Sequence, residues 1–169
     1  AGKDRNQAIA IIKSGALGKV VSAWAWTGKV AKNSYFDGAW LEKYPVTNPM
    51  PSHINWDLWK GCCTEDVPYS NNLANRKWRT YWEFGGGQLT DWCCHLLDII
   101  YLAMDLDNPI SVQTDTPRPA TAIGHSGFNQ SRITFNKSKY TAGQRFVIHL
   151  TLIHIRPCRR TTLSRSRWS

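Results

Sequence analysis

Three side chains that could do acid–base chemistry stand at helical spacing in one stretch of the sequence: Asp91, His95 and Asp98. Spacings of four and three residues return to the same face of an α-helix. An imidazole exchanges protons near neutral pH, and a carboxylate one turn away can orient it or stabilise its protonated form. Such a face can exchange a proton with a substrate hydroxyl. On spacing alone, it can equally be a solvated polar face.

The surrounding residues predict the helix that would position these groups, from about Gln88 to Met104. A broad apolar stripe, suited to packing on a core, runs along another side of this helix and consists of Leu89, Trp92, Leu96, Ile99, Ile100 and Ala103. Directly before it stands Gly85-Gly86-Gly87, whose backbone can turn sharply and approach a ligand closely. A glycine turn at the start of such a helix favours a functional site over a plain surface.

The segment Gly85-Gly86-Gly87-…-Asp91-…-His95-…-Asp98 resembles the helix that carries the catalytic Asp and His of the Gfo/Idh/MocA family, the relatives of glucose–fructose oxidoreductase and inositol dehydrogenase. Residues 12–20 are similar to the turn that leads into the family's C-terminal domain. Residues 55–79 look like a long insertion found in a bacterial subgroup. The resemblance covers roughly residues 5–148 and depends on the order and spacing of these motifs together.

This resemblance implies an NAD(P)-dependent oxidoreductase that acts on a sugar, a polyol or a related carbohydrate. His95 would take or give the hydroxyl proton, and Asp91 would orient His95 or bind a substrate hydroxyl. Three further residues would contact the substrate: Asp98, Trp78 and Arg79. No metal site is predicted.

Family members bind the nicotinamide dinucleotide on an N-terminal Rossmann domain through a Gly-x-Gly-x-x-Gly turn. No such turn precedes Lys19, and Gly85–Gly87 lack the βαβ setting that the motif requires. The sequence therefore predicts the substrate-binding domain, with the cofactor domain missing. Such a chain is expected to be inactive by itself and to bind NAD(P) weakly.

Three segments are predicted along the chain. Residues 1–18 would form the end of the preceding domain and a linker helix, and residues 19–149 the C-terminal α/β substrate domain. Residues 150–169 are predicted to be a non-native or disordered tail, because their apolar alternation is lost. Six arginines and no acid stand from Arg145 onward. A basic tail can bind nucleic acid, but no nucleic-acid partner is predicted.

The fold expected for these elements is α+β. Helices at 5–14 and 88–104 would cover one face of an open, mainly antiparallel sheet in a two-layer sandwich, with strands at 19–27, 110–114, 131–135 and 145–150. Apolar residues on both faces of strand 19–27 predict either a central strand or one covered by a helix. Residues 28–75 read as a long irregular insertion, ordered by the tryptophans that we expect to pack in it or beside it: Trp40, Trp56, Trp59 and Trp78.

The composition bears on which other kinds of protein this chain could be. No run of about 18 apolar residues exists, so no membrane-spanning helix is predicted. The five cysteines lack the spacing of a zinc knuckle, so reduced thiols are expected. A cytoplasmic location is favoured, with export of the parent protein as the alternative. Homo-oligomer formation through the sheet is a further expectation. A second functional class stays open, a non-catalytic carbohydrate-binding or interaction module that uses the Trp-rich insertion or the basic tail.

Overall fold

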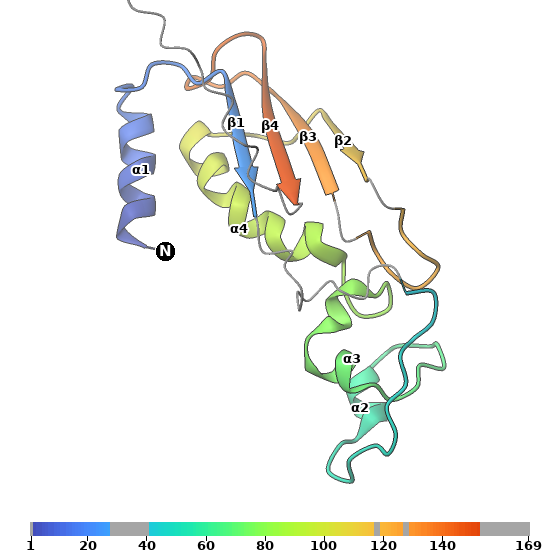
Figure 1. Cartoon of the computed structure of the whole chain (residues 1–169). Coiled ribbons are helices and arrows are strands. Elements are labelled where there is room, and N and C mark those ends of the chain that lie inside the picture. The colour runs from blue at the N-terminus through green and yellow to red at the C-terminus, as the bar shows by residue number, and fades with distance from the viewer. Residues whose placement is uncertain (1, 28–40, 117–118, 127–128, 153–169) are drawn as a thin grey trace, which may run out of the picture.

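The computed structural model describes residues 2–27, 41–116, 119–126 and 129–152 (Figure 1). Their regular elements follow in chain order: α1 (Lys3–Lys13), β1 (Ser22–Trp26), α2 (Trp56–Lys60), α3 (Asn71–Asn75), the 3₁₀ helix η1 (Lys77–Thr80), α4 (Gly87–Met104), β2 (Ser111–Asp115), β3 (Asn129–Asn136) and β4 (Arg145–Leu152). In the described residues, no helix is long and apolar enough to cross a membrane.

The four strands form one open sheet in the order β1-β4-β3-β2. β1 pairs with β4 in parallel, whereas β4 with β3 and β3 with β2 pair antiparallel. This mixed sheet, with α4 along one face, confirms the predicted α+β fold and its mainly antiparallel pairing (Figure 1).

Strand β1 is an edge strand of this described sheet, so the central position considered for residues 19–27 is wrong. The other alternative holds, because α4 covers one of its faces and Ala25 is buried there. On the opposite face Trp24 and Trp26 are 64% and 62% exposed. Trp24 stacks on His149 of β4, with ring centroids 4.0 Å apart. β1 therefore has apolar residues on both faces because one face packs on α4 and the other carries exposed tryptophans.

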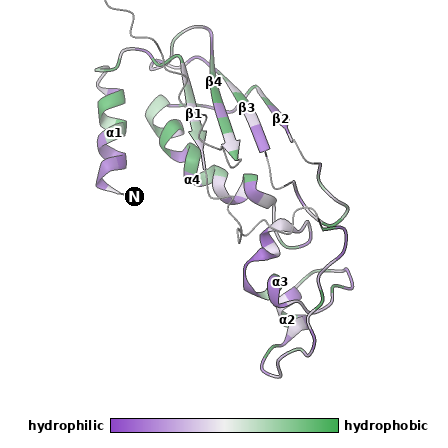
Figure 2. Cartoon of the chain, in the orientation of Figure 1, coloured by the Kyte–Doolittle hydropathy of each residue, from purple (hydrophilic) through white to green (hydrophobic). Residues whose placement is uncertain are grey.

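The main core lies between α4 and the sheet. Alternate residues of a strand point to opposite faces, and β4 buries every second side chain toward α4: Phe146, Ile148, Leu150 and Leu152. Figure 2 shows hydrophobic residues gathered on α4, β1 and β4. β4 continues to Leu152, two residues beyond the predicted end of this strand. Residues 153–169 lie outside the described part of the chain.

Helix α1 packs beside α4 and carries no fully buried residue of its own. Two ion pairs hold α1 in this place. Arg5 contacts Asp98 of α4 at 2.7 Å, and Lys13 contacts Asp105, which directly follows α4, at 2.8 Å. Exposed ion pairs contribute little individually, about 0–1 kcal/mol each. Partly buried Ile12, packed against the main core, adds an apolar contact. α1 is thus a helix held on the surface of α4.

The described part of the Trp-rich insertion packs around a second core. Its buried residues are Trp56, Val67, Tyr69, Leu73 and Tyr81. The indole nitrogen of Trp56 donates to the carbonyl of Val67 at 2.8 Å, and Trp59 stacks on Trp56 with centroids 4.5 Å apart. Trp78 also packs against this core. The ordering role predicted for these tryptophans is confirmed, whereas Trp40 lies outside the described residues.

Four cysteines fall in the described residues, and all four are free: Cys62, Cys63, Cys93 and Cys94. Burial raises the pKa of the Cys93 thiol, and its neighbour Cys94 adds to the shift. A raised pKa keeps the thiol protonated and unreactive. Packing rather than chemistry therefore accounts for Cys93.

The alternation along β4 predicts the effect of two neighbouring truncations. Phe146 is 0% exposed in the main core, so Phe146→Ala should lower the free energy of unfolding by about 3–5 kcal/mol. Val147 lies on the outer face and is only partly buried, so Val147→Ala should cost much less. Urea denaturation of both variants measures the difference. Equal losses would mean that β4 does not present alternate residues to α4.

Candidate functional site

Helix α4 begins in a glycine turn that allows unusually close backbone approach. A Cβ on Gly85 would lie 2.7 Å from the Cα of Arg79, and a Cβ on Gly87 would lie 2.7 Å from the Cβ of His125. Gly87 also has a φ of +71°, a conformation that L side chains rarely adopt. The glycines thus bring η1 and the residue-125 loop against the start of α4.

His125 stabilises this glycine turn through two hydrogen bonds. Its backbone nitrogen donates to the carbonyl of Thr80 at 2.8 Å. Its ring nitrogen Nε2 lies 2.8 Å from the carbonyl oxygen of Gly85. A carbonyl only accepts, so Nε2 carries the proton and Nδ1 is an acceptor in the neutral ring. Burial lowers the pKa of His125, and the bond to Gly85 partly opposes that shift. Sequence reasoning missed His125, because no spacing links it to the glycines.

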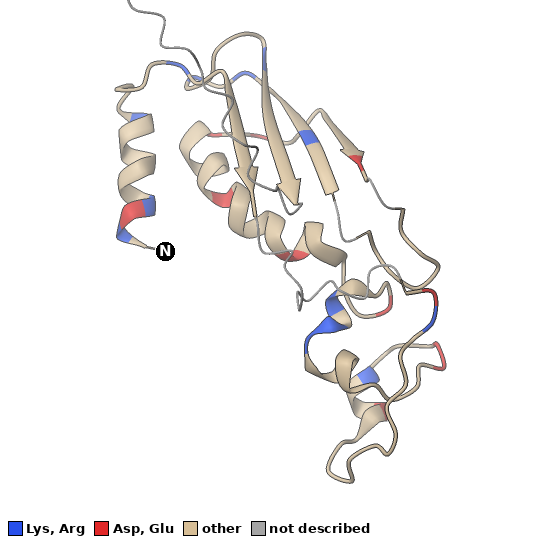
Figure 3. Cartoon of the chain, in the orientation of Figure 1, with Lys and Arg blue, Asp and Glu red and all other residues tan. Residues whose placement is uncertain are grey.

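The polar stripe of α4 carries Asp91, His95 and Asp98, as the spacing predicts, and none of the three belongs to the main core. Figure 3 shows acidic positions along α4 and basic positions on η1 beside its start. His95 is exposed, and the ring of Trp92 approaches it edge-on with centroids 5.9 Å apart. Within the described residues, no hydrogen bond joins Asp91 to His95.

Asp91 instead accepts a hydrogen bond from Arg79, whose Nε lies 3.0 Å from Oδ1. The Arg79 guanidinium also lies over the ring of Trp78, 4.4 Å from its centroid, and donates to the carbonyl of Arg76 at 3.3 Å. η1 supplies both Trp78 and Arg79. The structure therefore joins three of the predicted site residues by direct contact, with His95 one helical turn farther along α4.

Asp98, the fifth predicted site residue, has a different partner. Its Oδ2 lies 2.7 Å from the guanidinium of Arg5 on α1. That ion pair joins α1 to α4, a structural role which the spacing along α4 could not reveal. The substrate-binding role of Asp98 stays a prediction.

The described residues lack the features that two kinds of cofactor need. They contain no group of three or more His, Cys, Asp or Glu side chains that could hold a metal ion. A dinucleotide turn follows a strand and opens a helix within a βαβ unit. The glycine turn at Gly85–Gly87 follows η1 instead, so the residues described here do not form such a site.

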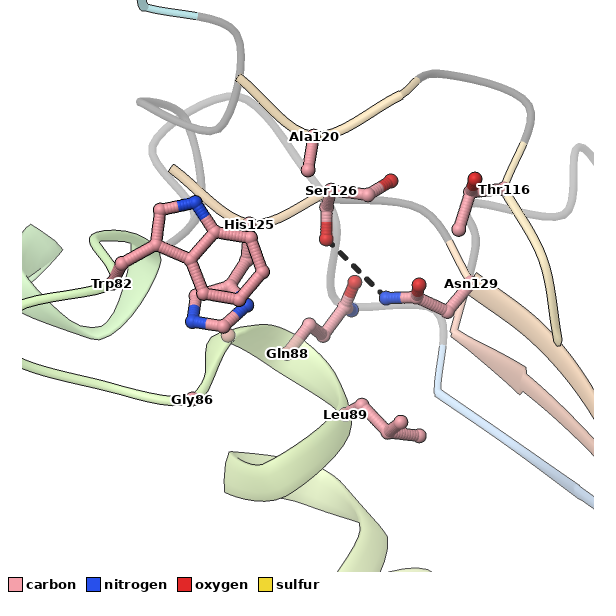
Figure 4. A pocket seen from close by; sticks show the side chains of 10 residues that line it. Trp82, Gly86, Gln88, Leu89, Thr116, Ala120, His125, Ser126 and Asn129 are labelled. Carbon is pink, nitrogen blue, oxygen red and sulfur yellow. Dashed lines mark hydrogen bonds between the residues drawn. The ribbon is translucent and has the colours of Figure 1, made fainter. Parts of the chain in front are cut away.

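A small cavity lies beside the glycine turn, between the start of α4 and the start of β3 (Figure 4). Its volume is about 200 Å³, and the residues that line it are Trp82, Gly86, Gly87, Gln88, Leu89, Thr116, Ala120, His125, Ser126 and Asn129. The stripe residues Asp91, His95 and Asp98 are not among them. The cavity therefore lies at the first residues of α4, and the polar stripe begins at Asp91, about one turn farther along.

The lowered pKa of His125 predicts a pH-dependent stability. The folded state holds the ring neutral, so the unfolded chain binds more protons below the ordinary pKa of 6.5. The stability that comes from the neutral His125 ring is therefore fully present above pH 6.5. It is lost as pH falls through the lower folded pKa. His125→Gln should remove this part of the acid destabilisation, which urea denaturation across this pH range measures.

The control for this experiment is His53→Gln, since His53 is exposed and lies outside the glycine turn. That variant should keep the same loss of unfolding free energy toward acid pH as the unaltered chain. If His125→Gln also kept the full loss, His125 would not be the group responsible.

The sequence matches one known protein family over most of its length. A family model described as "Oxidoreductase family, C-terminal alpha/beta domain" of the Gfo/Idh/MocA group matches residues 4–149. No curated protein matches the sequence significantly. The matched range spans all four strands up to His149 and the whole of α4, and it includes the glycine turn, Asp91 and His95. The chain therefore belongs to the Gfo/Idh/MocA oxidoreductase family and carries its C-terminal alpha/beta domain.

Proposed function

We propose that this domain supplies the substrate-binding and proton-transferring surface of an NAD(P)-dependent oxidoreductase acting on a sugar, a polyol or a related carbohydrate. The oxidoreductase class follows from the family. One observation supports the finer assignment most directly. Exposed His95 stands one turn beyond Asp91, whose carboxylate is held by Arg79 next to the tight glycine turn.

His95 is suited to handle the hydroxyl proton. Oxidation of an alcohol to a carbonyl requires the hydroxyl oxygen to lose its proton, and reduction requires the oxygen to gain one. An imidazole can do both near neutral pH. The His95 side chain is accessible on α4, so a substrate bound over this face can reach it. We therefore assign proton transfer to His95.

Asp91 and Arg79 act as a pair in this proposal. The bond from Arg79 uses Oδ1 of Asp91, which fixes the carboxylate and leaves Oδ2 to accept from a substrate hydroxyl. A carboxylate that is held in one orientation loses less entropy when it binds a ligand. Trp78 packs under the guanidinium and limits the conformations of Arg79. Asp91 thus binds substrate, and Arg79 and Trp78 position it.

Within the described residues, no dinucleotide turn is present to hold the nicotinamide cofactor of this proposal. The competing class, a non-catalytic carbohydrate-binding module, would use tryptophans of the insertion. Trp56 is buried and Trp59 stacks on it, so these two rings are engaged in packing. That arrangement supports the catalytic proposal over the binding module.

Self-association through the sheet remains a prediction. The outer face of the sheet exposes Trp24 and Trp26 on β1, and large exposed apolar side chains are enriched at protein interfaces. Sedimentation analysis of the chain at increasing concentration measures its oligomeric state directly. Trp24→Ser with Trp26→Ser should shift the equilibrium toward monomer.

The catalytic assignment predicts a large and selective kinetic loss. In the complete enzyme with NAD(P), His95→Ala should lower kcat by about 10²- to 10⁴-fold, because general acid–base catalysis typically contributes that much. KM should change far less. Asp91→Asn should also slow turnover, and the double variant should be little worse than His95→Ala, since residues that act as a unit are not additive.

Steady-state kinetics on a panel of sugars and polyols, with folding checked by circular dichroism, measures these effects. His53→Ala is the matched control, because His53 is exposed and lies in the insertion away from α4. It should leave kcat unchanged. Near-normal turnover by folded His95→Ala would show that another group transfers the proton.

A further inference from the structure

We propose that Thr121 is a positioning residue of the candidate site, which holds η1 where Arg79 can reach Asp91. Thr121 lies in the residue-125 loop, residues 119–126, between β2 and β3 and far along the chain from both members of that pair. The inference rests on the proposed function only for the role of Asp91 in binding substrate. The contacts that support it are independent of any reaction.

Every polar group of Thr121 takes part in a hydrogen bond. Its hydroxyl donates to the carbonyl of Leu41 at 2.9 Å and accepts from the backbone nitrogen of Gly124 at 3.0 Å. Its backbone nitrogen donates to the carbonyl of Gly124 at 2.9 Å, and its carbonyl accepts from the indole nitrogen of Trp82 at 3.1 Å. Thr121 thus closes a turn with Gly124 and connects that turn to two other segments of the chain.

The residues that directly follow η1 pair with this loop. The backbone nitrogen of Trp82 donates to the carbonyl of Ile123 at 3.1 Å, and Tyr81 forms an antiparallel β-bridge with Gly124. Gly124 is buried and Ile123 is partly buried. Leaving such backbone groups without partners is costly, so these contacts hold the two segments together. The loop that Thr121 closes is therefore fixed against the end of η1.

His125 holds two groups that lie beside the backbone of Arg79. Its backbone nitrogen donates to the carbonyl of Thr80, the residue after Arg79, at 2.8 Å. Its ring nitrogen Nε2 donates to the carbonyl of Gly85, also at 2.8 Å. A Cβ on Gly85 would lie 2.7 Å from the Cα of Arg79, so Gly85 is in close contact with that backbone. One residue of the loop thus confines Arg79 from two sides.

The bond from Arg79 to Asp91 depends on the position of η1 relative to α4. The distance from Nε to Oδ1 is 3.0 Å, and an N–H···O bond is lost when its length exceeds about 3.2 Å by much. Trp78 packs under the guanidinium but belongs to η1 itself, so it cannot fix η1 relative to α4. The residue-125 loop can do so, because His125 also lies against Gly87, the first residue of α4.

A second threonine shows what an ordinary turn does in this chain. Thr141 accepts from the backbone nitrogen of Ser138 at 2.8 Å and donates to its carbonyl at 3.3 Å. These hydroxyl bonds stay within the β3–β4 hairpin, at the opposite end of β3 from the residue-125 loop. The bonds of Thr121 instead cross to Leu41 and Trp82. Thr141 is therefore a matched control for the loss of a turn hydroxyl.

The test measures how fast the Nε–H of Arg79 exchanges with water in the full chain labelled with ¹⁵N. A hydrogen-bonded N–H exchanges when its bond opens. Thr121→Val keeps the side-chain shape but removes the hydroxyl, so it should raise this rate about tenfold, as expected for the loss of two hydrogen bonds. Asp91→Ala gives the rate of the same group after its acceptor is removed.

Two further variants separate positioning from a plain loss of stability. Thr121→Ser keeps the hydroxyl and should return the Arg79 rate to that of the unaltered chain. Thr141→Val removes a comparable hydroxyl and should leave the Arg79 rate unchanged, even where urea denaturation shows that it lowers the free energy of unfolding. An unchanged rate in Thr121→Val, an equal rise in Thr141→Val, or no recovery in Thr121→Ser would each overturn the inference.

A kinetic measurement distinguishes this inference from the proposed function. In the complete enzyme with NAD(P), Thr121→Val should lower kcat/KM about tenfold, mainly through a higher KM, because a loosened Asp91 binds substrate less well. Thr121→Ser should restore KM. A raised exchange rate of Arg79 with an unchanged KM would leave Thr121 as the residue that positions Arg79, and would instead refute the substrate role of Asp91.

Discussion

The close approach of the glycine turn to its two neighbours is the contact on which the rest of the site depends. Gly85 lies against the backbone of Arg79, and Gly87 lies against His125, at distances that leave no room for a Cβ. A side chain at either position would push η1 or the residue-125 loop away. The pairing of Arg79 with Asp91, the seat of His125 and the cavity wall would then all shift together.

This turn also joins the two cores of the domain. On one side Tyr81 and Trp78 belong to the core of the Trp-rich insertion. On the other side α4 carries Leu97 and Met104 into the main core under the sheet. The polar stripe of α4 therefore starts where the two packed bodies meet. Rigid packing on both sides explains how short side-chain contacts can be maintained at an exposed helix face.

The features that sequence could predict are those with a local signal. Helical spacing predicted α4 and its polar stripe, and two-residue alternation predicted the strands that form β3 and β4. The predicted strand near β1 was correct, and of its two predicted settings the helix-covered one holds and the central one does not. Its parallel pairing with β4 could not be predicted, because that pairing joins distant parts of the chain. The same limit hid His125, which reaches the glycine turn from a separate loop. The partner of Asp98 was hidden too, since Arg5 stands on another helix. β4 also runs two residues past the predicted strand end at Leu150, although Leu150-Thr151-Leu152 continue its alternation.

The parallel pairing of β1 with β4 has a consequence for how the domain is made. β1 is synthesised before the other three described strands, and its hydrogen-bonding partner β4 is the last of them to emerge. Closing so long a segment costs chain entropy before any strand contact offsets it, which slows folding. During translation β1 must therefore wait, with its two tryptophans and an unpaired edge accessible, until almost the whole domain has left the ribosome. The nascent chain is most vulnerable to aggregation in that interval, and a general chaperone that shields β1 would act at that stage.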